Sequence, residues 1–141
     1  MKNKGYIKII NEEGKAPSVE AQLVNNTLWM MKFEMMHFFN VFGQKIEMNL
    51  RSIFKSGLLT EREVTHSHRY TEKGIEIEAI YYNLEVLIFL SYRIGTFEAK
   101  IFRQFVNSSL RKHLQKENYG NCKRCTKILW HFRTNQDYWM N

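Results

Sequence analysis

The sequence predicts an α+β fold: a small helix-turn-helix domain of winged type, with two β-hairpins and two packed C-terminal helices. Three observations predict this fold. Apolar residues recur at helical spacing in some segments, they alternate with polar residues in others, and Asn and Gly residues separate the segments. The chain has 141 residues, of which 44% are hydrophobic, so it is long enough to bury one core.

The N-terminal part predicts an arm followed by a hairpin. Residues 1–17 are polar and contain two glycines and the only proline, which favours an extended arm. Apolar and polar side chains alternate over residues 19–23, and residues 28–30 are apolar again after the turn signal of Asn25 and Asn26. Alternation on both sides of a turn signal predicts a β-hairpin.

Two helices joined by a tight turn are predicted next. Residues 31–39 are dense in Met and Phe, which suits a buried helix of about two and a half turns. Asn and Gly within residues 40–43 predict the turn, and Gly57 is a typical stop for the second helix. That second helix covers residues 44–54 and places its apolar side chains on one face: Ile46, Leu50, Ile53 and Phe54.

A second hairpin and two further helices complete the predicted domain. Residues 64–70 and 75–81 flank the turn signal "TEKG" and read as two paired strands that could serve as a wing. Asn83 is predicted to cap a helix over residues 84–93. The longest predicted helix covers residues 98–117, with an apolar stripe formed by Ala99, Phe102, Val106, Leu110 and Leu114.

Charge and composition indicate which class of partner the chain binds and in which cellular compartment it works. The net charge of +7 and the isoelectric point of about 9.5 favour a polyanionic partner such as nucleic acid or an anionic membrane surface. No run of about 18 apolar residues is present, so neither a membrane span nor a membrane partner is predicted. The N-terminus "MKNKGYIKII" continues into the polar "NEEGK" and does not resemble a secretory signal. Two cysteines are too few for a disulfide framework, so the predicted compartment is the cytoplasm.

The second predicted helix has the division of side chains that a DNA-recognition helix needs. Its face opposite the apolar stripe carries Gln44, Met48, Arg51 and Lys55, with Lys45 and Ser52 on the flank. Gln suits adenine, Arg suits guanine, Met can contact a thymine methyl group, and Lys and Ser suit phosphates. The sequence therefore predicts binding to double-stranded DNA through these six residues. A homodimer, formed through the long helix, would suit a two-fold DNA site. Glu47 opposes phosphate binding, and any amphipathic surface helix shows a similar pattern.

Two arginines have two interpretations that remain open at this stage. Arg93 and Arg103 could form a clamp for a phosphate or a carboxylate, because a guanidinium group binds such anions through paired donors. Alternatively, they bridge the two C-terminal helices or pair with Glu85 or Glu98.

Other residue clusters do not predict a site. His66 and His68 fall on one face of a strand, but no third metal ligand is near them in the sequence. The pair Cys122 and Cys125, with the distant His131, provides only part of a four-ligand zinc site. The sequence contains none of the common catalytic motifs, so neither an enzyme nor a metal or cofactor is predicted.

Four blocks of the sequence are similar to a known family. They are the hairpin ending in Trp29, "MMHFFNVFGQKIEMNLRSIFKSGLL", "YYNLEVLIFLSYRIGT" and "IFRQFV…LRKHL". In this order and without an internal gap, from Val19 to about Leu114, the chain resembles the RhuM family of bacterial virulence-associated proteins, often found on mobile DNA. It departs from residues that are common in that family at Met48, Asn49, Ser91 and Phe105.

The resemblance implies a helix-turn-helix fold and a regulatory or mobile-element role, although the family's biochemical activity is poorly defined. Some longer relatives carry a Fic-type domain, whose motif this chain lacks. We expect a truncated or rearranged member with an arm (1–17), a RhuM-like domain (18–117) and a divergent basic tail (118–141). The alternative function is a protein-interaction module that binds no nucleic acid and docks its partner on the C-terminal helices.

Overall fold

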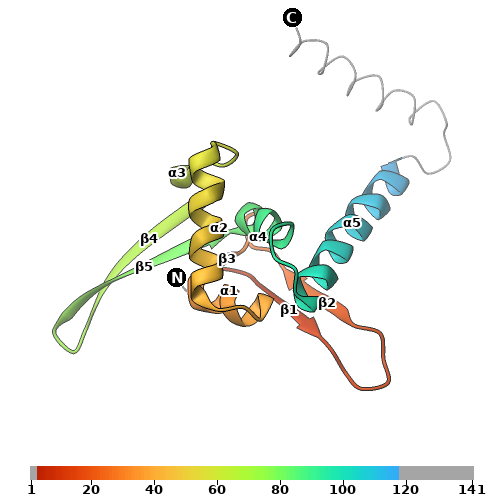
Figure 1. Ribbon diagram of the computed structural model, residues 1–141, viewed down its shortest axis with the longest axis horizontal. Coiled ribbons are helices and arrows are strands. Elements are labelled where there is room, and N and C mark those ends of the chain that lie inside the picture. The colour runs from red at the N-terminus through yellow and green to blue at the C-terminus, as the bar shows by residue number, and fades with distance from the viewer. Residues whose placement is uncertain (1–2, 118–141) are drawn as a thin grey trace, which may run out of the picture. The chain divides into compact units, whose positions relative to one another are not determined.

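The computed structural model describes residues 3–117 of the chain. Its elements are, in order, β1 (Tyr6–Ile10), β2 (Ser18–Gln22), β3 (Trp29–Met31), α1 (Lys32–Phe39), α2 (Gly43–Ser56), α3 (Glu61–Val64), β4 (Thr65–Glu72), β5 (Ile75–Asn83), α4 (Leu84–Ser91) and α5 (Phe97–Glu117). Helices combined with two small antiparallel sheets make the α+β fold that the sequence predicts (Figure 1). The chain divides into two units, Met1–Phe105 and Val106–Asn141. Among residues 3–117, no helix combines the length and the apolar character needed to cross a bilayer.

The first hairpin joins β1 to β2, and the predicted pairing of residues 19–23 with 28–30 is wrong. β1 lies within the stretch that the sequence suggests is an arm. The predicted return strand forms β3, which pairs antiparallel with β5. A turn does form at Asn25 and Asn26, but it closes only one isolated bridge. Met30, which pairs with Tyr82 of β5, is only 6% exposed, and local alternation cannot reveal which strand covers it.

A three-stranded sheet has the order β3-β5-β4. β4 and β5 pair along the whole length of β4, and Lys73 and Gly74 connect them with φ values of 51° and 78°. Two successive positive φ values belong to the tight hairpin turn whose twist matches that of the flanking strands. The turn predicted from "TEKG" is therefore confirmed, and the hairpin projects away from the helices (Figure 1).

α1 and α2 are two successive helices joined by a short turn. The chain reverses at Asn40, whose left-handed backbone (φ 53°, ψ 55°) is one that Asn tolerates better than most residues. α2 ends at the predicted stop, where Gly57 has a φ of 79°. The apolar stripe of α2, formed by Ile46, Leu50 and Ile53, is at most 3% exposed. This face therefore fixes α2 in the core.

Polar caps begin α4 and α5. The side chain of Asn83 accepts a hydrogen bond from the backbone N–H of Val86 at 3.3 Å, which confirms the predicted cap of α4. The Thr96 hydroxyl accepts a hydrogen bond from the N–H of Ala99 at 3.3 Å and donates one to the carbonyl oxygen of Phe39 at 2.7 Å. One hydroxyl thus caps α5 and ties its start to the end of α1.

Only the first part of the apolar stripe predicted for α5 is buried. Phe102 is fully buried, and its ring lies edge-on to Phe38 and Phe39, with centroids 5.4 Å and 6.2 Å away. Leu110 and Leu114, which belong to the second unit, are 57% and 40% exposed. The contribution of α5 to the core therefore comes from its first turns.

Replacing Thr96 with Ala removes the hydroxyl that caps α5 and contacts the end of α1. We expect the free energy of unfolding to fall by about 1–2 kcal/mol, the range for losing a helix cap and one further hydrogen bond. Urea denaturation followed by circular dichroism measures this difference. The control is Thr60→Ala, since Thr60 precedes α3 without making a side-chain capping bond. Equal losses in both variants would contradict the role of Thr96.

Candidate nucleic-acid interface

The outer face of α2 carries the six residues that the sequence assigns to DNA contact. Because the apolar stripe faces the core, residues at the intervening helical positions point outward. Ser52 is half-buried, and the other five side chains are exposed, with Met48 at 60% and the Arg51 side chain at 79%. These five are Gln44, Lys45, Met48, Arg51 and Lys55.

A cavity of about 470 Å³ lies between α2 and β5, along one side of this outer face. Its charged lining residues are Lys32, Glu47, Arg51, Lys55 and Glu61. Leu50, Phe54, Ile80 and Tyr82 complete the lining. The part of β5 around Ile80 and Tyr82 therefore borders α2 on the side of Arg51, with a cleft of mixed charge between them.

Glu47 is paired with cations on both sides. Its carboxylate accepts a hydrogen bond from the Lys32 ammonium group, and its other oxygen lies 3.8 Å from Nε of Arg51. The hydrogen bond from Lys32 is the main reason why the pKa of Glu47 is lowered, and the same bond raises the pKa of Lys32. The negative charge of Glu47 is therefore offset within the protein. Sequence reasoning missed Lys32 because no local pattern links residues on separate helices.

Arg93 lies on the opposite flank of α2. Its Nε donates to Oδ1 of Asn49 at 3.0 Å, and its Nη2 donates to the Ser52 hydroxyl at 2.6 Å. Asn49 in turn donates to the backbone carbonyl of Lys45 at 2.8 Å. The exposed guanidinium group is thus oriented by α2, and among the described residues its hydrogen-bond partners are Asn49 and Ser52 instead of the glutamates suggested by the sequence. The only sequence signal for Asn49 was its departure from the RhuM pattern.

Arg103 has a different position from Arg93. Its Nη1 donates to the carbonyl oxygens of Ser91 and Ile94, the latter at 2.8 Å. These bonds join the first half of α5 to the end of α4 and to the loop that follows it. Of the two alternatives for Arg103, the bridge between the C-terminal helices is the one that this geometry supports. The two arginines do not share a binding partner among the described residues.

The two strand histidines pack against aromatic rings. His66 lies 6.0 Å from Trp29, and His68 stacks on Tyr70 at 6.1 Å between ring centroids. Within residues 3–117, no three His, Cys, Asp or Glu side chains are grouped closely enough to hold a metal ion. The cysteine pair and His131 lie outside the described residues.

Comparison with known proteins adds no relative, because no protein-family model, no curated protein and no solved structure matches the chain.

We expect the ion pair of Lys32 and Glu47 to make a small contribution to the free energy of unfolding, and this contribution depends on pH. Because folding lowers the pKa of Glu47, its contribution is complete above 4.5, the ordinary pKa of a glutamate, and is lost as the pH falls through the folded pKa. We expect Glu47→Gln to lower the free energy of unfolding by less than about 1 kcal/mol at pH 7, since both side chains are partly exposed and screened by solvent.

Thermal or urea unfolding of Glu47→Gln and of the unmodified chain, measured at neutral and acidic pH, tests this expectation. The difference between the two proteins should shrink as the pH falls. Glu76→Gln is the matched control, because Glu76 is an exposed glutamate on β5. A difference for Glu47→Gln that grows on acidification would refute the assignment.

Proposed function

We propose that the chain binds double-stranded DNA and that the outer face of α2 enters the major groove. The observation that carries the proposal is the division of α2 into a buried apolar stripe and an opposite face of exposed side chains. A recognition helix needs this division, because the fold must hold one face while the other reaches the edges of the bases. The preceding α1 and the reversal at Asn40 supply the rest of a helix-turn-helix.

The exposed side chains have the chemistry for both base edges and phosphates. Gln44 suits the paired donor and acceptor of adenine, Arg51 suits the two acceptors of guanine, and Met48 can contact a thymine methyl group. Lys45 and Lys55 suit phosphates, which fix the position of a protein on the duplex. The net charge of +7 adds long-range attraction to a polyanion.

Arg93 extends the phosphate-binding flank that the sequence assigned to Lys45 and Ser52. Two of its five N–H groups bind Asn49 and Ser52, which leaves others to meet a phosphate. An arginine already held in position loses less side-chain entropy when it binds an anion. The Ser52 hydroxyl accepts one of these bonds and keeps its own proton for a second partner.

In this proposal the hairpin of β4 and β5 acts as a wing, with the part of β5 around Ile80 and Tyr82 next to α2. Lys73 stands at its tip, in the turn, where a long cation can reach a phosphate. Arg69 lies 3.9 Å from Glu78 across the hairpin, and both side chains are largely exposed. The cleft between hairpin and helix contains more cations than carboxylates, which supports a backbone contact on this side.

We infer further that the chain is a RhuM-type protein with a regulatory or mobile-element role in the bacterial cytoplasm. Support comes from the four sequence blocks. Three of them coincide with α1 and α2, with the end of β5 and α4, and with α5, whereas the first runs through β2 to Trp29 at the start of β3 without forming the expected hairpin. Finding integrase or transposase genes beside this gene would support the role. A position among housekeeping genes only would count against it.

A protein-interaction module is the second candidate. The observation that favours it is a cavity of about 500 Å³ lined by Leu58, Ile88, Phe89, Tyr92 and Arg93. Leu58 and Tyr92 are 60% and 58% exposed there, more than is usual for core-forming side chains. A partner held on this apolar surface would respond little to salt.

The salt dependence of binding distinguishes DNA binding from protein interaction. We expect fluorescence anisotropy to show that the chain binds a random DNA duplex, with an affinity that falls steeply between about 50 and 200 mM salt. The double substitution Arg51→Ala/Lys55→Ala should weaken binding and reduce the salt slope by about 1–2. Lys15→Ala/Lys100→Ala removes the same charge from exposed positions outside α2 and is the control. Absence of binding at low salt, or equal binding by both double variants, would favour the interaction module.

A second comparison distinguishes phosphate contact from base contact. We expect Arg93→Ala to weaken binding to all duplex sequences by a similar factor and to reduce the salt slope by about 1. Gln44→Ala should instead relax the base preference at one position of a site selected from a random pool, by about 1–3 kcal/mol. A sequence-dependent effect of Arg93→Ala would contradict its role at the phosphates.

A further inference from the structure

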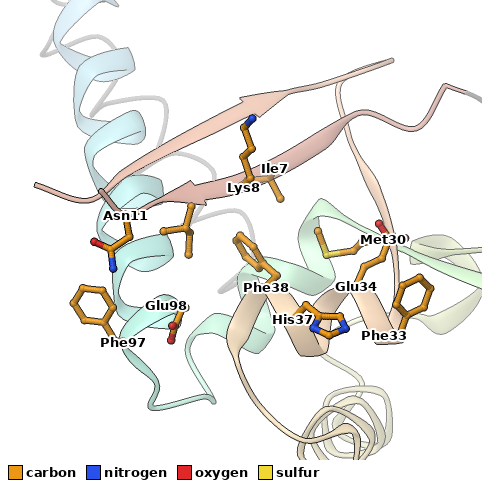
Figure 2. Close-up of a pocket in the computed structure, with 11 residues that line it drawn as sticks. Ile7, Lys8, Asn11, Met30, Phe33, Glu34, His37, Phe38, Phe97 and Glu98 are labelled. Atoms are coloured by element: carbon orange, nitrogen blue, oxygen red, sulfur yellow. The ribbon is translucent and has the colours of Figure 1, made fainter. Parts of the chain in front are cut away.

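A cavity of about 470 Å³ borders β1 in the first unit of the chain (Figure 2). Residues of β1, β3, α1 and the start of α5 line it, and β2 contributes none. Ile7 points toward the helices and Lys8 points away from them (Figure 2), yet both residues line the cavity. Of the two hairpin strands, β1 alone borders the cavity, and within the described residues the edge of β1 that lies away from β2 has no strand partner.

That edge of β1 presents backbone groups for a further strand. Within residues 3–117, β1 pairs with β2 alone. In an antiparallel pair, alternate residues direct their N–H and C=O groups away from the partner strand. Such an edge is a template for another strand, and a two-stranded hairpin gains stability from one. The site therefore fits an extended segment that offers apolar side chains to the cavity.

We propose that this occupant is β1 of a second copy of the chain, so that two antiparallel β1 strands join the two hairpins into one continuous sheet. β1 has apolar side chains left for such a contact, because Ile9 and Ile10 are only half-buried within one copy, whereas Ile7 is already buried there. A two-fold axis gives both copies the same contact at once, so neither cavity is left open.

Charge on β1 is compatible with its pairing to an identical strand. Edge strands commonly use an unpaired Lys to repel other strands, and Lys8 is the only charged residue of β1. Here its ammonium group lies 2.9 Å from a carboxylate oxygen of Glu20 on β2. The Lys8 ammonium also lies 5.9 Å from the centre of the Tyr6 ring. The repelling charge is thus offset inside each hairpin, and two β1 edges can approach without facing uncompensated like charges.

Two exposed aromatic rings extend the same surface. Phe33 of α1 and Phe97 of α5 are 53% and 51% exposed, and they stand at opposite ends of the cavity (Figure 2). In the paired arrangement, α1 of each copy lies on the same side of the joined sheet, so the second copy covers these rings. Dimerisation thereby uses β1 and α1, and not the long helix α5 that the sequence suggests.

The mass of the full chain in solution tests this interface. Sedimentation equilibrium from low to high micromolar concentration should give twice the 17.0 kDa mass of one chain. Phe33→Glu and Phe97→Glu place a charge on the paired surface and should raise the dissociation constant of the dimer by about tenfold or more. Phe42→Glu is the control, because Phe42 is 86% exposed and lies outside this cavity. It should leave the dissociation constant unchanged.

Amide hydrogen exchange on the unmodified chain gives a readout that does not depend on variant folding. Alternate amides of β1 should gain protection as the protein concentration rises. A monomer at all concentrations, or a dimer unaffected by both variants, overturns the proposal. Protection that is independent of concentration would assign the edge to a segment of the same chain and would also overturn it. Dimerisation requires no DNA, so this result and the DNA-binding result are independent.

Discussion

Strand β5 pairs with the strands on both sides of the α1–α2 segment. β3 leads directly into α1, β4 follows α2 and the short α3, and both strands pair with β5. Backbone hydrogen bonds to a single strand therefore determine where the two helices begin and end relative to the sheet. β5 then continues without a loop into α4, and its Ala79, Tyr81 and Tyr82 are buried. The position of α2 beside the hairpin follows from this arrangement.

The features that could be predicted from the sequence depend on residues close together in the chain. Gly57 ends α2, Asn83 begins α4, and Lys73 with Gly74 makes the hairpin turn. Each of these depends on the backbone preferences of one or two residues. Strand partners could not be predicted in this way. Alternation identifies a strand, but the choice between possible partners depends on which pairing buries more apolar surface in the complete fold.

At the candidate interface, too, some features could be predicted from nearby residues and others could not. Helical periodicity was sufficient to predict which face of α2 is exposed, since its stripe of Ile46, Leu50 and Ile53 is buried. Periodicity could not predict the neighbours of that face, because they come from other elements. Lys32 reaches Glu47 from α1, and Arg93 reaches Asn49 from beyond the end of α4. These charged hydrogen bonds orient side chains on both flanks of α2, and each one required the complete fold to bring its partners together.

The hairpin of β4 and β5 also differs from the core in its local stability. None of the eight residues of β4 is buried, so its cohesion depends on backbone bonds to β5 and on exposed cross-strand pairs. A segment without buried apolar contacts opens locally at a small cost in free energy, long before the core unfolds. The helix and the hairpin therefore differ in conformational entropy as well as in sequence. A ligand that contacts both would find one rigid surface and one that must lose freedom as it binds.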